Sequence, residues 1–299
     1  MKHSANFTSA ATRMAWSVCR AWLCVVLLWS NAAKAQPYSL IDTPLRQLTL
    51  ETSYGFASTT LPGFPNPIVA ALHLEGMFGI KRYLFSEHSN QIVDYAHPHA
   101  FAGYYTVLAA PVETGVGVQT VTMNLFRVGL GVRDGIGYRL TQVAITPTIN
   151  SAMLLARPSF GRLPQDRDSA SRAERLNNSL HFGTLTAAGV DFQVASALAV
   201  NLNYDWMIVF PRFVLLQFMG SHFLQWGLQI AAGYVIDAIF GKFPMLLPWA
   251  HFLIKNTINF TLYALRQSQM HFPLASEAPM SVQSFKVGVS FYIGPKILD

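Results

Sequence analysis

A histidine and a glutamate that could act as an acid–base pair lie two residues apart in a strand-like stretch. His73 and Glu75 share one face of residues 68–78, and apolar residues occupy the other face. Residues two apart on a strand project from the same side, so the pair could act on a common substrate. Two polar side chains that line a wet interior would give the same pattern, and catalysis requires further converging groups. We favour the second interpretation and assign no catalytic residue.

Histidines in a second stretch could bind a metal ion. His97 and His99 flank Pro98, and His88 lies nearby within residues 86–99, a polar segment that we predict to be a loop. A loop cluster without a defined third ligand is usually solvated rather than bound to metal. We therefore expect neither a metal ion nor another cofactor.

The sequence lacks the motifs of soluble enzymes. Gly129-x-Gly131 is without the later glycine of a dinucleotide-binding loop, and neither a zinc-helix motif nor a nucleophile elbow occurs. We therefore do not expect an enzyme. A lipid-modifying enzyme that uses a histidine with a serine or glutamate is a third-ranked hypothesis, with His73 and His181 as its candidate residues.

The clearest candidate for an element that positions polar residues runs from Leu198 to Phe210. Alternate residues are apolar, and the opposite face holds Ala199 followed by three polar residues. This period of two indicates a strand. A strand that is apolar on one face and wet on the other is typical of a transmembrane β-barrel. The apolar face comprises Leu198, Val200, Leu202, Tyr204, Trp206, Ile208 and Phe210.

The preceding segment, Leu180 to Val194, keeps one parity and is separated from this strand by only three residues. We predict a tight hairpin on the periplasmic side, where outer-membrane barrels have their short connections. Inward polar residues either tune the passage of ions or solutes, or hydrogen-bond to one another and to arginines to fill a closed interior. The lumen-lining candidates are His73, Glu75, His181, Asp191, Gln193, Asn201, Asn203 and Asp205.

Three features are expected to interrupt the strands. A shift of the apolar parity by one residue indicates a bulge near Arg127. The tripeptide Arg133-Asp134-Gly135 matches a hairpin turn. Residues near 157–178 contain five arginines, three acidic residues and two prolines, which predicts a long polar loop.

The first 35 residues have the composition of a signal peptide. Lys2, Arg13 and Arg20 form a basic start, a short apolar run follows, and a small-x-small pattern ends at Ala35. The apolar run is too short to span a bilayer, which takes about 20 residues. We predict cleavage near Ala35 and export to the outer membrane of a Gram-negative bacterium.

Removal of this leader changes the charge and the cysteine content. Both cysteines lie within it, so the mature chain offers neither a disulfide nor a thiolate metal site. The mature chain keeps 17 Lys and Arg against 15 Asp and Glu, a balance that gives no electrostatic footprint for nucleic acid. Only 12% of all residues are charged, against about a quarter in soluble domains. A membrane environment explains this shortage.

Residues 211–279 predict two helices instead of strands. Residues 213–236 carry no formal charge, and a second helix is expected from Pro248 to about Gln269. We expect a hairpin that packs across polar stripes and exposes apolar surface to lipid or to a protein partner. A plug inside the barrel and membrane-spanning helices of an inner-membrane protein are the alternatives. The stripes comprise Gln217, Ser221, Gln225, Gln229 and Asp237 in the first helix and His251, Lys255 and Asn259 in the second.

The strand period returns in residues 285–293. Within it, Lys286-x-Gly288-x-x-Phe291-x-Ile293 resembles the terminal insertion signal of bacterial outer-membrane β-barrel proteins. The resemblance implies that the barrel assembly machinery pairs with this strand. In that class the signal commonly ends on a terminal aromatic residue, whereas here further residues follow, and this departure bears on the mode of assembly.

The sequence thus predicts an all-β transmembrane antiparallel barrel of about 8 to 10 strands with an inserted α-helical hairpin. Residues 36–210 would supply strands, residues 211–279 the hairpin, and residues 280–299 the final strand and tail. The expected function is that of a structural or interaction component of the cell envelope. The alternative is a channel or transporter for a small or hydrophobic solute, gated by the helical insertion. Expected partners are outer-membrane lipid, the barrel assembly machinery and a protein that contacts the insertion; nucleic acid is not expected.

Overall fold

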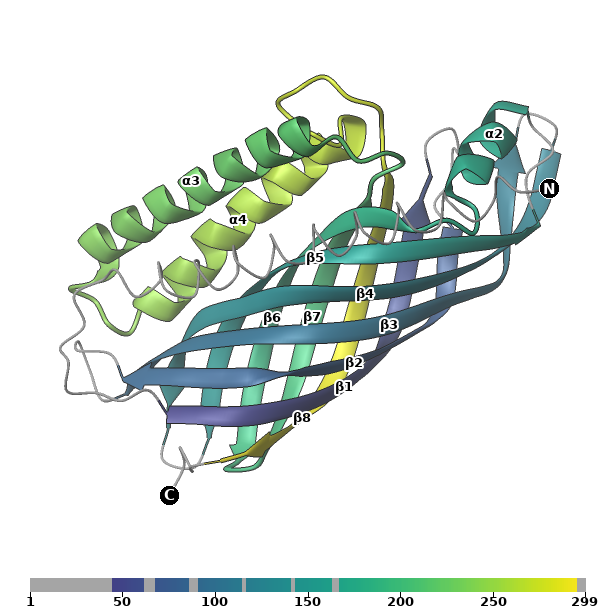
Figure 1. The fold of residues 1–299 in the computed structure, drawn as a ribbon. Coiled ribbons are helices and arrows are strands. Elements are labelled where there is room, and N and C mark those ends of the chain that lie inside the picture. The colour runs from purple at the N-terminus through teal and green to yellow at the C-terminus, as the bar shows by residue number, and fades with distance from the viewer. Residues whose placement is uncertain are drawn as a thin grey trace, which may run out of the picture. The chain divides into compact units, whose positions relative to one another are not determined.

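The computed structural model describes residues 45–61, 68–85, 91–114, 117–140, 143–162 and 167–294, so the predicted leader and its cleavage position lie outside the described residues. Within the described part, eight strands and three helices are present (Figure 1). The strands are β1 (Leu45–Thr60), β2 (Ile68–Phe85), β3 (Ile92–Thr114), β4 (Gly117–Arg139), β5 (Ala144–Arg162), β6 (His181–Ala195), β7 (Leu198–Val209) and β8 (Met280–Ile293). The helices are α2 (Arg167–Leu176), α3 (Leu215–Phe240) and α4 (Leu247–Ser268).

The eight strands form one closed barrel in sequence order, and all neighbours are antiparallel. The barrel closes where β8 pairs with β1, from Leu48 opposite Ile293 to Thr60 opposite Ser281. Closure pairs the backbone groups that an edge strand would leave free. The predicted antiparallel barrel is confirmed, and its strand number falls within the expected range.

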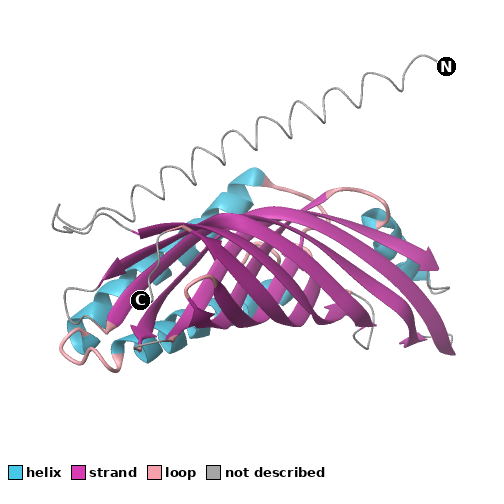
Figure 2. Ribbon diagram, turned by 90° about the horizontal axis from the view of Figure 1, so that it is seen from below, coloured by secondary structure: helices cyan, strands magenta, loops and turns pink. Residues whose placement is uncertain are grey.

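The two ends of the barrel differ in their connections. At one end, which we call the long-connection end, β5 leads to β6 through α2, and β7 leads to β8 through α3 and α4. At the opposite, short-turn end, β6 joins β7 through residues 196–197 and β4 joins β5 through residues 140–143. Figure 2 shows the strands tilted around a common interior with helices on the outside.

Alternation along β7 shows why this sequence forms the wall. Asn201, Asn203 and Asp205 are buried in the interior, whereas Leu202 and Tyr204 between them are each 37% exposed on the outer side. Side chains of a strand alternate between its two faces, so the polar residues meet inside and the apolar residues cover the outside.

The long-connection half of the interior is apolar. Phe101, Leu125 and Phe160 belong to one buried cluster at this end. This explains why the bulge predicted near Arg127 is wrong: β4 pairs regularly with β5 there, with Arg127 opposite Ala156. The apolar residues before Arg127 point into the apolar half of the interior, whereas the apolar residues after it point outward. The shift of apolar parity therefore marks the change from an apolar to a polar interior and not a bulge.

The hairpin turn predicted at Arg133-Asp134-Gly135 is also wrong. These residues lie within β4 and pair with residues 148–150 of β5. Gly135 is required by close packing, because a Cβ there would lie 2.2 Å from the carbonyl oxygen of Pro147. Within this strand, Arg133 is buried inside the barrel, whereas Asp134 points out with its side chain 42% exposed.

Two segments predicted as loops contain regular structure. β3 already begins at Ile92, and the β2–β3 register is interrupted between Gly79 and Arg82, opposite the part of β3 that contains Pro98. Pro98 has no N–H to donate, so an interrupted ladder accommodates it. In the polar segment near 157–178, β5 continues to Arg162 and α2 follows.

Helix α2 closes over the apolar half of the interior. Its Ala173 and Leu176 are buried in the same apolar cluster, while Glu174 and Arg175 are exposed. The charged residues that suggested a loop thus occupy the solvent side of a short amphipathic helix.

The hairpin helices meet through part of the predicted polar stripe. Asn259 Oδ1 accepts from Gln225 and Gln229 at 3.0 and 2.8 Å. Ser221 Oγ accepts from Arg266 Nε at 3.0 Å. Gln217 is only half-buried and Asp237 is exposed, because a strict four-residue row winds away from the contact line.

Helix α4 packs along the outer wall over β4–β7, and α3 lies on its far side (Figure 1). The Trp206 ring of β7 lies 5.7 Å from that of Phe260 in α4. Outward Ile208 is only 2% exposed in this region, whereas outward Phe78 of β2 is 53% exposed. The hairpin therefore covers one side of the barrel.

Candidate functional site

Four charged side chains from four strands meet in the barrel interior. Glu75 of β2 contacts Arg127 of β4 and lies 2.6 Å from Lys286 Nζ of β8. Asp205 of β7 lies 3.1 Å from Arg127 Nη2 and 2.8 Å from Lys286 Nζ. All four are buried. We call Glu75, Arg127, Asp205 and Lys286 the Glu75 cluster.

A second group of the same kind lies nearer the short-turn end. Arg133 of β4 donates two hydrogen bonds to Glu51 of β1, at 2.9 and 3.1 Å. Asp191 of β6 lies 3.6 Å from Arg133 Nη1 and 3.7 Å from Lys81 Nζ of β2. We call Glu51, Lys81, Arg133 and Asp191 the Glu51 cluster.

Each cluster contains two acids and two bases, so each is electrically balanced. A buried charge is costly unless it is paired. Each charge of the two clusters lies within 4 Å of an opposite charge, and the 3.6 and 3.7 Å contacts of Asp191 are ion pairs longer than hydrogen bonds. The interior of an eight-stranded barrel is just wide enough for side chains to fill it or for one small ligand to enter, and here the side chains of the two clusters occupy it. The clusters therefore make this half of the barrel a filled polar core.

His73 and Glu75 do not form a free acid–base pair. The His73 ring stacks on Tyr105, with ring centroids 3.9 Å apart, and its Nε2 lies 3.3 Å from Arg127 Nη2. Each Glu75 oxygen contacts a cation, Arg127 or Lys286. Both residues are buried, so the geometry supports a role in filling the interior.

Aromatic residues pack around a lysine toward the short-turn end. Lys81 Nζ donates to Tyr292 Oη at 2.7 Å and lies 4.2 to 4.8 Å from the ring centres of Tyr83, Tyr95 and Tyr292. Gln193 Oε1 accepts from Tyr83 Oη at 3.0 Å. These cation–π contacts and hydrogen bonds fill this region of the interior.

The remaining lumen candidates lie in different surroundings. Asn201 Nδ2 donates to Ser290 Oγ at 2.7 Å. Asn203 is buried against Gly189, where a Cβ would lie 2.1 Å from Asn203 Oδ1. His181 stands apart from both clusters, at the rim of the long-connection end. Seven of the eight candidates thus lie in the filled interior, and His181 does not share their contacts.

His97 and His99 lie inside the barrel, on β3, contrary to the predicted loop position. Their ring centroids are 5.2 Å apart, and His99 Nδ1 lies 2.9 Å from the carbonyl oxygen of His97. Within the described residues, no group of three His, Cys, Asp or Glu side chains is placed to hold a metal ion. His88 lies outside the described residues.

The C-terminal signal residues divide between the two faces of β8. Phe291 and Ile293 are exposed on the outer side, whereas Lys286 and Gly288 face inward. Gly288 leaves room for Asn201, because a Cβ there would lie 2.2 Å from Asn201 Oδ1. The signal therefore contains a member of the Glu75 cluster, Lys286, whose packing role the sequence pattern did not indicate.

The hairpin and the barrel wall are joined by polar contacts. Lys255 of α4 lies 3.6 Å from Asp134, which points outward from β4. Tyr138 Oη donates to the carbonyl oxygen of Met245 at 2.5 Å. The Lys255 side chain therefore contacts the barrel, while its carbonyl oxygen accepts from Gln229 Nε2 of α3 at 3.1 Å, within the predicted stripe between the helices. His251 of the same stripe is buried.

The base of the hairpin holds a buried cation. Arg266 donates to Ser221 and to Gln225 Oε1, the latter at 2.7 Å. His271, in the segment between α4 and β8, is buried beside the Phe210 ring. Burial, followed by the nearby cations Arg266 and Arg212, lowers the pKa of His271.

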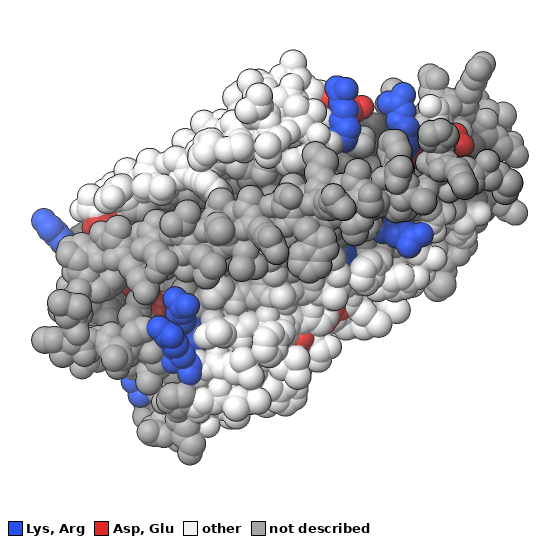
Figure 3. Space-filling model, viewed as in Figure 1, with Lys and Arg blue, Asp and Glu red and all other residues white. Residues whose placement is uncertain are grey.

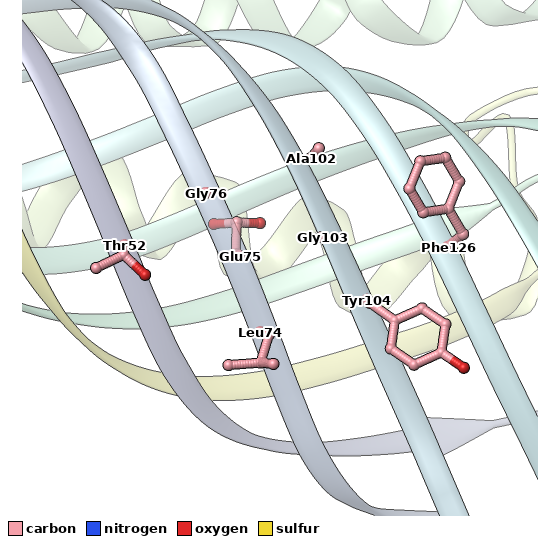
Figure 4. A pocket seen from close by; sticks show the side chains of 8 residues that line it. All are labelled: Thr52, Leu74, Glu75, Gly76, Ala102, Gly103, Tyr104 and Phe126. Atoms are coloured by element: carbon pink, nitrogen blue, oxygen red, sulfur yellow. The ribbon is translucent and has the colours of Figure 1, made fainter.

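The outer wall away from the hairpin contains a shallow hollow of about 360 Å³ (Figure 4). Small outward residues Thr52, Gly76 and Ala102 form its base, and a Cβ added at Gly76 would meet no atom within 4 Å. Leu74, Tyr104 and Phe126 surround this base. The hollow is a mostly apolar surface feature of β1–β4.

Charged side chains are sparse on the face shown in Figure 3. Most visible Lys and Arg lie toward the two ends of the described surface, and the described residues seen between them are mostly uncharged. Outside the barrel, apolar side chains are exposed at many positions, including Leu50, Phe56 and Phe285. This distribution is the reverse of the interior, where charges gather.

Sequence reasoning did not place five of the eight clustered charges in the lumen. Glu51, Lys81, Arg127 and Arg133 were not assigned to the lumen, and Lys286 was assigned only to the assembly signal. Their signal was weak because their partners lie on other strands and are brought together only when the barrel closes. Ser179, which contacts His181, was missed because α2 was not predicted.

No protein-family model matches the sequence, and no curated protein matches it. Similar solved structures include Neisserial surface protein A, at 8% identity over 82% of this chain and 96% of that chain, with a TM-score of 0.38. Ail, the attachment invasion locus protein of Yersinia pestis, matches at 8% identity over 84% of this chain and 100% of that chain (TM-score 0.30). The outer membrane protease OmpT from Escherichia coli matches at 6% identity over 86% of this chain and 99% of that chain (TM-score 0.32). With TM-scores below 0.5, no property of these proteins is transferred to this chain.

Proposed function

We propose that this chain is an outer-membrane β-barrel that serves as a structural or interaction component of the cell envelope, with its helical hairpin held against the barrel inside the bilayer. The proposal is supported by the apolar outer wall, the filled interior and the contact between hairpin and wall.

The outer wall is suited to lipid. Leu50 is 57% exposed and Phe56 is 59% exposed, and similar residues recur along the other strands. Exposing apolar surface to water costs about 25 cal/mol per Å², a cost that disappears in hydrocarbon. The strands are 12 to 23 residues long, and about 9 to 11 residues suffice to cross a bilayer.

The filled interior supports a structural role over a channel. An ion or solute that crossed the barrel would have to separate the paired charges of the Glu75 and Glu51 clusters. Breaking one such buried pair costs about 3–5 kcal/mol. A hairpin that gated the pore would also need to reach the lumen, whereas α4 packs on the outside of the wall.

The contact between Lys255 and Asp134 carries the proposal. Asp134 points outward from a strand whose surroundings are apolar, and an outward charge is destabilising on the lipid face of a barrel. Lys255 supplies the opposite charge within a helix that covers the wall. The hairpin is therefore a fixed part of the wall, and its outer helix becomes the new surface.

Helix α3 provides that surface. Of the described helices, α3 has the length and apolar composition needed to cross a membrane. Its 26 residues extend about 39 Å at 1.5 Å per residue, compared with a hydrocarbon core of about 30 Å. We propose that its exposed face meets outer-membrane lipid and a membrane-embedded protein partner.

A spin label tests the placement of α3. The predicted mature chain has no cysteine, so Leu228→Cys on the exposed face of α3 can be labelled specifically in vesicles. We expect contact with membrane-dissolved oxygen and protection from a water-soluble nickel reagent. Ala197→Cys, at the exposed position of the short turn, is the matched control. A label at residue 228 that is as open to nickel as one at residue 197 would contradict the proposal.

The interaction role requires a separate measurement. The mass of the native protein in mild detergent, with and without the hairpin, should show a partner that is lost with the hairpin. A lone monomer that behaves identically after hairpin deletion would leave only the structural role.

A further inference from the structure

A serine and a histidine at the rim of the long-connection end have the geometry of a nucleophile and its base. Ser179 Oγ lies 2.6 Å from His181 Nε2. His181 Nδ1 lies 3.1 Å from the carbonyl oxygen of Phe210. Ser179 is half-buried, and its neighbours Asn178 and Leu180 are exposed. The pair therefore lies beside open surface, unlike His73.

The Phe210 carbonyl fixes the tautomer of His181. A carbonyl oxygen only accepts hydrogen bonds, so His181 Nδ1 must carry a proton to bond with it. In the neutral ring, Nε2 is then an acceptor, and it faces the Ser179 hydroxyl. This is the arrangement in which an imidazole can take the serine proton, with a third group holding the base.

Ser179 also lies near two carbonyl oxygens of α2, which could explain it as a simple end cap. Both of those distances, to Arg175 and Leu176, are 3.4 Å. A hydroxyl has one proton to donate, and hydroxyl hydrogen bonds are strongest near 2.7 Å. The contact to His181 is therefore the principal one.

The turn that presents Ser179 is held by β5. Asn178 adopts a positive φ of 56° and donates its N–H to the carbonyl oxygen of Pro158 at 2.8 Å. Asn177 Oδ1 accepts from the Phe160 N–H at 2.9 Å. Non-glycine residues with positive φ are uncommon and favour asparagine. The serine is thus positioned by a defined turn.

Part of the surface beside the pair is apolar, although Arg175 and Asn178 are also exposed there. Leu180 is 66% exposed, and Phe182 packs against Phe213 with ring centroids 4.5 Å apart. We propose that Ser179 and His181 form a hydrolytic site for a carboxylic ester of a membrane lipid, with Ser179 as nucleophile and His181 as general base. The choice of a lipid ester rests on the proposed membrane location of the barrel.

The reaction would proceed in two balanced steps. Ser179 Oγ bonds to the ester carbonyl carbon while its proton passes to His181 Nε2, and the alcohol then leaves with that proton. Water next adds to the acyl-serine with His181 again as base, which releases the carboxylic acid and restores the serine hydroxyl.

A fluorophosphonate probe tests for an activated serine in the full chain. In detergent micelles, we expect covalent labelling of the wild type and at least a tenfold loss of labelling in Ser179→Ala and in His181→Gln. Ser268→Ala, at the exposed end of α4, is the matched control and should label like the wild type. A heat-modifiability gel establishes that each variant keeps its barrel. An unlabelled wild type, or a folded Ser179→Ala that labels normally, would overturn the proposal.

Ester hydrolysis tests the chemistry and separates it from the membrane proposal. A soluble short-chain ester can be hydrolysed in micelles, where no bilayer is present. Phosphatidylethanolamine in vesicles can be hydrolysed only if the site reaches a lipid in a bilayer. Hydrolysis of both substrates, lost in Ser179→Ala, supports the lipid site. Hydrolysis of the soluble ester alone would overturn the lipid substrate and leave the barrel's location to the spin-label test. No hydrolysis of either would overturn the catalytic site.

Discussion

Replacement of Arg127 by an uncharged residue tests whether the charge balance of the Glu75 cluster stabilises the barrel. In Arg127→Met, the apolar side chain keeps much of the volume but leaves Glu75 and Asp205 with Lys286 as their remaining cluster cation. Lys286 Nζ lies 2.6 Å from the first carboxylate and 2.8 Å from the second. The cluster then carries one uncompensated negative charge in a site that is closed to water.

The expected destabilisation is about 3–5 kcal/mol, the usual cost of breaking a buried ion pair by removing one partner. The double variant Arg127→Met/Asp205→Asn removes one acid as well and restores neutrality. It should therefore recover a large part of that loss. Strong non-additivity is expected because the two side chains are in direct contact at 3.1 Å.

Urea unfolding from lipid vesicles, followed by tryptophan fluorescence, measures these free energies. Arg175→Met on the exposed side of α2 is the control and should change stability by less than about 0.5 kcal/mol. If Arg127→Met costs no more than this control, or if the double variant is simply additive, the balanced-cluster interpretation is refuted.

Three further changes probe the hairpin. Lys255→Met leaves Asp134 without its cation, so we expect faster hydrogen exchange in α4, reversed when Asp134→Asn is added. Asn259→Leu removes the acceptor for Gln225 and should cost about 1–3 kcal/mol in urea unfolding, because buried amides lose their partners. The pKa of His271 is lowered in the native state. As the pH falls below about 6.5, His271 therefore takes up a proton in the unfolded chain but not in the native chain. Stability should therefore fall between pH 7.5 and pH 5.5, and less so in His271→Gln.

Each of these expectations has a clear contrary result. Unchanged exchange in Lys255→Met would show that the hairpin does not depend on the charge pair. A neutral Asn259→Leu would show that the amides find other partners. An identical pH dependence in the wild type and His271→Gln would assign the proton uptake to another group.

The strand and hairpin pattern could be predicted because it is local. Alternation over Leu198 to Phe210 requires only that one face meets lipid and the other meets the interior. The change from a period of two to long uncharged segments likewise placed the helices near residues 211–279. Both signals are contained within one segment and need no knowledge of its neighbours.

The errors arose where the interior changes character. Inward Leu125 looks like a lipid-facing residue because it meets an apolar interior, so the sequence suggested a bulge at Arg127. Pro98 suggested a loop because the interrupted β2–β3 ladder that accommodates it is invisible in the sequence. The ionic clusters depend on barrel register, which brings Glu75 and Lys286 together across more than two hundred residues.

The rim pair was partly within reach of sequence analysis. His181 was identified as an inward polar residue, but its role was assigned by parity to the lumen. The contact with Ser179 depends on where α2 ends and on the turn that follows. A short amphipathic helix in a charged segment gives too few apolar positions to be recognised against a loop.

Planar-bilayer conductance of the full chain and of a hairpin-deleted chain tests the central claim most directly. We expect no ion conductance from either, because the Glu75 and Glu51 clusters fill the interior whether or not the hairpin is present. Stable single-channel currents from the full chain, or currents that appear only after deletion of the hairpin, would contradict a closed barrel and favour a gated pore.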